Sequence, residues 1–249
     1  MNSERFWEVD FSRGIGIVMM IASNFITDLQ FFENYNAHEI FWKVFAVVTA
    51  SIFLLLVGIS LNLSYAKSKD FKKYLKRGAF IFGLGLIITL ITFFFIPHDY
   101  IRFGVLHLIG LSIILAYPFL KLDKRFSLVL GAILVFMGFL VKNIVLNSNF
   151  LLWIGFRTAD FVSVDYFPLL PWFGVVLIGL FLGKWLYPDG VCRFKVPDLT
   201  KIANQQFLEW KNARHFFIRF IKPISWLGKH SLVIYFIHQP ILLGMLYFL

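Results

Sequence analysis

The sequence has little charge and almost no cysteine. Only 15% of its 249 residues are charged, whereas 59% are hydrophobic; soluble domains carry about 25% charged residues. So little polar surface cannot cover so much apolar surface, which excludes a soluble globular fold and indicates lipid as the solvent. The single Cys192 excludes an internal disulfide. No HxxxH or CxxC pattern occurs, so we expect no bound metal.

Long apolar runs fill most of the chain. A helix needs roughly 20 apolar residues to cross a bilayer, and these unbroken runs lack the alternation of transmembrane barrel strands. The sequence therefore predicts an all-α integral membrane protein, with one transmembrane domain over residues 1–249. The bundle of about seven transmembrane helices is predicted to cover residues 14–32, 41–64, 78–96, 103–120, 126–146, 167–187 and about 226–249.

Basic residues are concentrated in alternate connections between these spans. They follow the second, fourth and sixth spans, in residues 65–77, 121–125 and 184–223. Because cytoplasmic loops collect Lys and Arg, we expect a cytoplasmic N-terminus in a cell (plasma) membrane. The net charge of +10 then indicates contact with membrane lipid rather than with nucleic acid. Residues 198–222 mix aromatic and basic side chains, which predicts an amphipathic helix on the cytoplasmic surface.

Polar side chains interrupt the first predicted span. Asn24 and Asp28 are four residues apart, so a helix places them on one face. A carboxylate inside the bilayer is costly, and Asp28 is therefore expected to face the bundle interior and a partner. His38 follows in the next connection. A purely structural pair that serves helix packing would use the same two side chains, and the sequence leaves that alternative open.

A second group of polar residues is predicted at the outer level of the membrane. Its members flank the start of the fourth span or lie in the long connection before the sixth, and they are candidates for the substrate side of a site. Alternatively, the arginines pair with nearby carboxylates in the headgroup layer, and the histidine is a hydrogen-bonded structural residue. The candidates are Arg102, His107, Arg157 and Asp165.

The opening of the chain carries a family resemblance. Arg5, Asp10, the pair Arg13-Gly14 and Asn24 form the pattern R-x4-D-x2-R-G-x9-N. This pattern resembles the first span of the transmembrane acyltransferases. The acyltransferase-3 family has histidine at the last position, whereas asparagine resembles the branch of heparan-α-glucosaminide N-acetyltransferase and its prokaryotic relatives. Three later stretches are similar to spans of these proteins in the same order: FLLLVGISLNLSY, IRFGVLHLIGLSIILAYPFL and WLGKHSLVIYFIHQPIL.

The resemblance implies an enzyme that moves an acetyl group from cytoplasmic acetyl-CoA to an acceptor across the membrane. An amino sugar, a glycan or a lipid headgroup would fit as acceptor. A catalytic histidine is implied in the connection after the first span, where His38 is the only one. Asn24 would then stabilise the oxyanion, and Asp28 would orient His38. Arg13, held in place by Asp10, would meet the CoA phosphates.

Two other functions remain open on the residues alone. A small-molecule or lipid transporter would also place Asn and Asp inside the membrane, although the chain shows no internal repeat of the kind common in transporters. A structural membrane subunit would leave Asp28 unexplained. Small residues such as Gly83 and Gly85 could pack against a second copy of the chain, which would make a homodimer.

Overall fold

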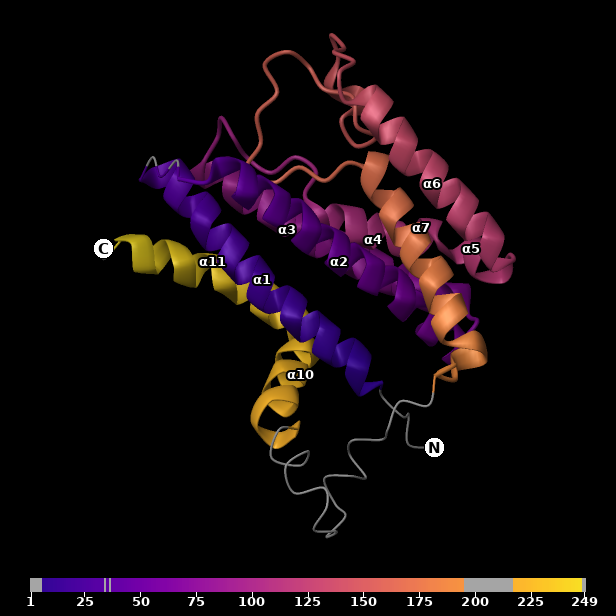
Figure 1. The fold of residues 1–249 in the computed structure, drawn as a ribbon. Coiled ribbons are helices and arrows are strands. Elements are labelled where there is room, and N and C mark those ends of the chain that lie inside the picture. The colour runs from indigo at the N-terminus through magenta and orange to yellow at the C-terminus, as the bar shows by residue number, and fades with distance from the viewer. Residues whose placement is uncertain (1–5, 34, 36, 195–216, 248–249) are drawn as a thin grey trace. The chain divides into compact units, whose positions relative to one another are not determined.

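The computed structural model is built of helices throughout the part of the chain that it describes, residues 6–33, 35, 37–194 and 217–247 (Figure 1). The prediction of an all-α fold is therefore confirmed. The helices are α1 (Trp7–Phe32), α2 (Glu39–Lys67), α3 (Phe71–Phe95), α4 (Val105–Leu115), α5 (Tyr117–Lys121), α6 (Lys124–Val141), α7 (Leu169–Leu186), α10 (Lys222–Lys229) and α11 (Ser231–Tyr247). Shorter turns are η1 (Asn149–Leu151), η2 (Pro188–Gly190) and η4 (Phe217–Ile221).

Five of the described helices are long and apolar enough to cross a membrane, namely α1, α2, α3, α6 and α7. The fourth and seventh predicted spans correspond to α4 and α11, whose apolar stretches are shorter, at Val105–Leu115 and Ser231–Leu242. The count of seven spans and the cytoplasmic N-terminus therefore remain predictions. The predicted amphipathic helix over 198–222 falls mostly on residues 195–216, which lie outside the described residues.

Local sequence explains where several helices begin and break. The Asp70 side chain accepts a hydrogen bond from the Lys72 N–H at 3.0 Å, which caps α3 ahead of its basic first turns. The helix therefore begins earlier than the predicted residue 78. Pro118 lies at the start of α5 and has no N–H to donate, so the predicted fourth span is divided at Ala116 into α4 and α5.

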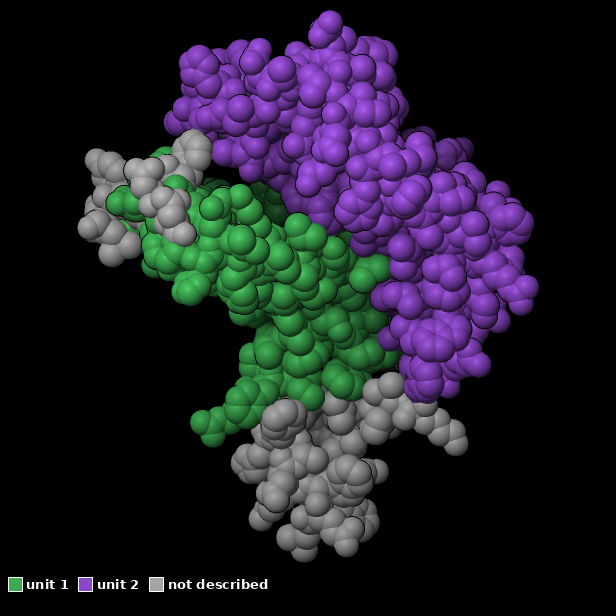
Figure 2. Space-filling model, turned by 45° about the horizontal axis from the view of Figure 1, so that its top comes forward, with its two compact units in different colours: residues 1–56, 195–249 green, residues 57–194 purple. Residues whose placement is uncertain are grey.

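The chain divides into two compact units, which Figure 2 shows in green and purple. Unit 1 comprises residues 1–56 and 195–249, and unit 2 comprises residues 57–194. In unit 1, α1 packs against α10 and α11. A Cβ atom built at Gly228 would overlap the carbonyl oxygen of Asp10, and one built at Gly14 would overlap that of Ile224. The backbones of α1 and α10 are therefore in direct contact, as small residues allow in membrane helices.

Unit 2 contains two pairs of closely packed helices, α3 with α4 and α6 with α7. A Cβ built at Gly78 would lie 2.7 Å from the Gly110 carbonyl oxygen, and the reverse distance is also 2.7 Å. Two connections between these helices, residues 96–104 and 142–168, lie next to each other. They are joined by backbone hydrogen bonds, from Val164 to Asp99 at 3.0 Å and from Phe167 to Phe103 at 2.9 Å. We call these two segments the connection layer.

Candidate functional site

The polar face of α1 is paired with α11 inside unit 1. The Asn24 amide nitrogen lies 2.7 Å from Nε2 of His238. One helical turn further on, the Gln239 amide donates to Oδ1 of Asp28 at 2.9 Å. Asp28 and His238 are each 7% exposed. The expectation that Asp28 faces the bundle interior and a partner is met, and two hydrogen bonds connect the beginning of the chain to its end.

The hydrogen bonds of His238 define its tautomer. Its Nδ1 lies 2.6 Å from the Tyr235 carbonyl oxygen, which can only accept. Nδ1 therefore carries the proton, and Nε2 accepts from the amide of Asn24. His238 lies in the stretch WLGKHSLVIYFIHQPIL of the family resemblance, and its ring is hydrogen-bonded to a neighbouring helix. The structure identifies that neighbour as the helix of the candidate oxyanion donor.

His38 is placed differently from the expectation that Asp28 orients it. It lies exposed in the connection before α2, with a left-handed φ of 55° that is uncommon outside glycine. Asp28 bonds to Gln239 instead, and its Oδ2 has no hydrogen-bond partner among the described residues. The predicted contact between Asp28 and His38 is thus corrected, because α11 supplies the partner. The catalytic role of His38 stays a prediction.

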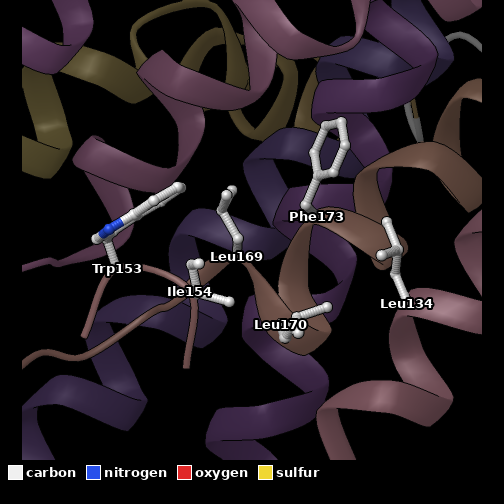
Figure 3. A pocket seen from close by; sticks show the side chains of 6 residues that line it. All are labelled: Leu134, Trp153, Ile154, Leu169, Leu170 and Phe173. Atoms are coloured by element: carbon white, nitrogen blue, oxygen red, sulfur yellow. The ribbon is translucent and has the colours of Figure 1, made fainter. Parts of the chain in front are cut away.

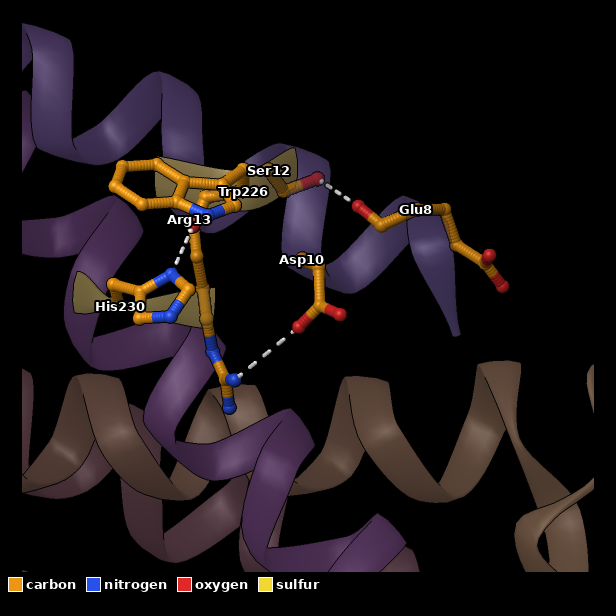
Figure 4. A network of polar contacts seen from close by, with 6 residues as sticks. All are labelled: Glu8, Asp10, Ser12, Arg13, Trp226 and His230. Carbon is orange, nitrogen blue, oxygen red and sulfur yellow. Dashed lines mark hydrogen bonds and ion pairs between the residues drawn. The ribbon is translucent and has the colours of Figure 1, made fainter. Parts of the chain in front are cut away.

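Arg13 and Asp10 form an ion pair one turn apart on α1. The Arg13 guanidinium lies 3.7 Å from Oδ1 of Asp10, as expected from the sequence. Figure 4 shows the pair together with Trp226 of α10 and His230, the residue after that helix, whose rings are 4.5 Å apart. Oδ2 of Asp10 is buried without a hydrogen-bond partner in the described chain. The side chain of Arg13 is 28% exposed, so part of its guanidinium can be reached by an anion.

His107 occupies a fully enclosed position in unit 2, with 2% of its surface exposed. Its Nδ1 accepts from the Gly104 N–H at 3.2 Å, and its Nε2 lies 3.3 Å from the Thr89 hydroxyl. A Cβ on Gly85 would lie 3.0 Å from the ring. Both ring nitrogens are therefore engaged within the bundle, which is the arrangement of a structural histidine. Gly85 packs against this ring, so it does not offer a free face to a second copy.

Asp165 caps the start of α4. Its Oδ2 accepts a hydrogen bond from the Val105 N–H at 3.1 Å. Gly104 precedes that residue and has no side chain with which to cap the helix, so the carboxyl group of a distant segment takes this place. A negative charge at a helix N-terminus is also favoured by the helix dipole. Asp165 therefore caps a helix, which is a structural role beside the predicted substrate-side role.

The stability of the protein is expected to depend on pH through Asp165. Burial raises the pKa of its carboxyl group from 3.8 to about 6, against the opposing hydrogen bond from Val105. The folded state therefore holds this proton more tightly than the unfolded chain. The resulting stabilisation, on the order of 1–3 kcal/mol, is full below about pH 4 and is lost as the pH rises through about 6.

The measurement is the thermal unfolding midpoint of the detergent-solubilised protein between pH 4 and 7. The midpoint should fall across this range in the wild type, and the fall should be smaller in Asp165→Asn. Asp160→Asn, an exposed acid of the same connection, serves as the control and should follow the wild type. Equal slopes for the wild type and Asp165→Asn would contradict the prediction.

Arg102 and Arg157 both lie in the connection layer, and both rest on aromatic rings. The alternative that they pair with nearby carboxylates is not realised, because the described residues contain no ion pair to either guanidinium. Arg102 lies 4.9 Å from the ring centre of Tyr100, and Arg157 lies 4.8 Å from that of Tyr166. The four substrate-side candidates of the sequence therefore have two different settings. His107 and Asp165 are bonded to α4 and its flanks, and the two arginines have no acidic partner.

An apolar pocket of about 260 Å³ opens beside the connection layer (Figure 3). Its wall contains no titratable side chain, which makes it unsuited to acid–base chemistry and suited to a hydrocarbon chain. The residues that line it are Leu134, Trp153, Ile154, Leu169, Leu170 and Phe173.

Sequence reasoning missed Gln239 entirely. An amide at a helix position next to a histidine carries no signal by itself, and only the proximity of α11 to α1 reveals its role. Gln239 lies in the stretch YFIHQP, between His238 and Pro240.

Comparison with known protein families extends the resemblance of the opening stretch to almost the whole chain. Residues 5–240 match the catalytic domain described as heparan-alpha-glucosaminide N-acetyltransferase, catalytic. Searches of curated proteins and of solved structures found no match. The matched range begins at Arg5 and includes both sides of the α1–α11 contact. The chain therefore belongs to the family of heparan-α-glucosaminide N-acetyltransferase catalytic domains.

Proposed function

We propose that this membrane acetyltransferase takes its acetyl group from cytoplasmic acetyl-CoA and transfers it to an amine or hydroxyl acceptor on the outer side of the cell membrane. Membership in the family supports an acetyltransferase and does not favour the transporter that the sequence alone left open. The observation that carries the proposal is the half-buried hydrogen bond between Asn24 and His238 at 2.7 Å. This hydrogen bond places the amide of Asn24, on α1, beside the imidazole of His238, on α11.

The chemistry needs a base and an oxyanion donor. The acceptor nitrogen or oxygen attacks the thioester carbonyl, the C–S bond breaks, and the acceptor proton passes through a base to the leaving thiolate. The Asn24 amide is suited to donate to the oxyanion of the tetrahedral intermediate. His38 is the proposed base, since an imidazole nitrogen can accept a proton and return it. His238 is proposed as the residue that positions the Asn24 amide.

The binding site for acetyl-CoA, the acetyl donor, is proposed at the start of α1. CoA carries several phosphates, so its binding surface should be basic. Arg13 lies at this end beside Asp10. The neighbouring helix α10 carries Lys222 and Lys229 and is followed by His230, and all three are exposed. Close packing of α10 on α1 through Gly14 and Gly228 brings these charges to the same end of unit 1.

Arg13 is therefore expected to contribute to acetyl-CoA binding. Replacement by glutamine removes one charge-assisted contact to phosphate, which is worth a factor of about 10–100 in affinity. Isothermal titration of the detergent-purified protein with acetyl-CoA, and with free CoA, measures the effect.

Arg125→Gln provides the matched control, because it removes the same charge from an exposed position at the start of α6. It should leave acetyl-CoA affinity within about twofold of the wild type. The donor assignment fails if folded wild-type protein does not bind acetyl-CoA at millimolar concentration. The assignment of Arg13 fails if both variants bind equally well.

A further inference from the structure

Each of the two arginines of the connection layer contacts one ring of the same aromatic pair. The guanidinium of Arg102 lies 5.4 Å from the ring centre of Phe161, and that of Arg157 lies 4.8 Å from the ring centre of Tyr166. The rings of Phe161 and Tyr166 are themselves 4.7 Å apart. Contact with an aromatic face restricts the orientation of a guanidinium. Both side chains are therefore oriented before any ligand arrives.

Neither guanidinium is neutralised by the protein. Three carboxylates belong to the same layer, yet none comes within 4.0 Å of either arginine in the described residues. The Nε atom of Arg102 is buried and has no hydrogen-bond partner there. A buried donor without an acceptor costs about 1–3 kcal/mol, so an acceptor that the chain does not supply is expected at this position.

The surroundings of these charges are apolar. Phe150, Val162 and Val164 of the same layer are 79%, 58% and 43% exposed. The apolar pocket of Figure 3 begins at Trp153, the residue after Leu152, whose carbonyl accepts the Tyr166 hydroxyl at 2.7 Å. The Tyr166 side chain, which contacts Arg157, is thus hydrogen-bonded to the backbone next to Trp153, a residue of the pocket wall. A ligand that fits both features has an anionic head and a hydrocarbon chain.

We propose that Arg102 and Arg157 bind the phosphate headgroup of an anionic lipid, with an acyl chain of that lipid in the pocket beside Trp153. Arginine forks match phosphate oxygens bidentately, and the layer lies at the ends of membrane-crossing helices, where lipid headgroups are found. A free phosphate would leave the pocket unused. This site is independent of the proposed acetyl transfer and is tested by binding alone.

Native mass spectrometry of the detergent-purified protein tests the proposal with defined probes. Dioleoyl phosphatidate is the expected ligand, and dioleoyl phosphatidylcholine has the same chains with a zwitterionic head. Wild-type protein should bind phosphatidate at least tenfold more tightly than phosphatidylcholine. The double variant Arg102→Gln/Arg157→Gln should lose at least tenfold in phosphatidate affinity, and Arg102→Lys/Arg157→Lys should fall between the two because lysine keeps charge without the fork.

The control variant Lys121→Gln/Arg125→Gln removes the same charge from two exposed positions outside the connection layer, at the end of α5 and the start of α6, and should bind phosphatidate within twofold of the wild type. Leu134→Trp fills the pocket and should weaken binding of dioleoyl phosphatidate but not of glycerol 3-phosphate. A monodisperse size-exclusion profile and a thermal unfolding midpoint close to that of the wild type show that each variant is folded.

Three outcomes would overturn the proposal. Equal affinity for phosphatidate and phosphatidylcholine would indicate ordinary annular lipid. Equal affinity for glycerol 3-phosphate and phosphatidate would indicate a phosphate site without a lipid. Binding of a sulfated glucosamine disaccharide in place of phosphatidate would indicate an anionic glycan site. None of these results depends on whether the protein transfers acetyl groups.

Discussion

Replacing Asn24 with alanine is expected to lower the rate of acetyl transfer by about 10²–10³-fold, the loss that follows removal of one oxyanion donor. Acetyl-CoA affinity should change little, because the donor is proposed to bind at Arg13, near the start of α1. The measurement is the turnover number and the acetyl-CoA dissociation constant of the same purified preparation. Loss of turnover with retained binding separates a catalytic donor from a residue that only supports the fold.

Asn62→Ala is the matched control for this variant. Asn62 is a buried asparagine of α2 whose amide also donates across helices, to the Tyr187 carbonyl oxygen at 3.1 Å. Its removal should lower thermal stability and leave turnover per folded molecule unchanged. If Asn24→Ala behaves as Asn62→Ala does, the amide of Asn24 is a packing group and the oxyanion assignment is wrong.

Variants of His38 and His238 are expected to give different results in the same turnover assay. His38→Ala should lose turnover to an extent comparable with Asn24→Ala and should remove the pH dependence of the rate that a histidine base causes. His238→Ala should also slow turnover, because the Asn24 amide loses its anchor. His238→Gln should restore part of that rate, since a glutamine carbonyl can accept the same hydrogen bond. A full loss that glutamine does not rescue would reassign the base to His238.

Replacing Gly228 with valine is expected to have the largest effect on stability. Any Cβ at this position overlaps the Asp10 carbonyl oxygen and approaches the Gly14 nitrogen within 2.9 Å. Both are backbone atoms, so relief requires α10 to move away from α1. Overpacking of this kind costs about 1–3 kcal/mol when side chains can shift and more when only backbone can. We expect a large fall in the thermal midpoint, or no monodisperse protein in size-exclusion chromatography.

Gly244→Val in α11 is the control for the loss of a glycine. Nothing in the described residues lies within 4 Å of a Cβ built at Gly244. This variant should remain monodisperse with a midpoint close to that of the wild type. Wild-type stability in Gly228→Val would mean that α1 and α10 do not cross at this point, and would remove the reason for placing the charges of α10 beside Arg13.

The helices could be predicted from the sequence where apolar length decides them. The predicted span 41–64 lies within α2, and 167–187 covers α7. Hydropathy reports the apolar part of a helix and not its ends, so the basic first turns of α3 were placed outside the span. The predicted span near 226–249 covers two helices, because the chain turns at His230 between α10 and α11. Hydropathy measures how apolar a stretch is, so it does not detect a single residue whose backbone is not helical.

The sequence predicted the site residues on α1 but not their partners on α11. The spacing of Asn24 and Asp28 gave a shared helix face, and Arg13 was correctly expected beside Asp10. The partners on α11 are 214 and 211 residues away along the chain. Sequence periodicity extends over a few helical turns and contains no information about such distances. The family resemblance implied a catalytic histidine at His38 and therefore a contact between His38 and Asp28, whereas the structure pairs Asp28 with Gln239.

The separation of Asn24 from His238 has a consequence for biosynthesis. Ribosomes add about 5–20 residues per second, so the 214 residues between these partners take roughly 10–40 s to make. During that time α1 resides in the translocation machinery or the bilayer with its amide and carboxylate unpaired. Such a helix inserts at a free-energy cost and is exposed to chaperones and membrane proteases that recognise polar faces. Maturation of the nascent protein therefore waits for the emergence of α11, and slow synthesis of the segment between them should lower the yield before any catalytic property is affected.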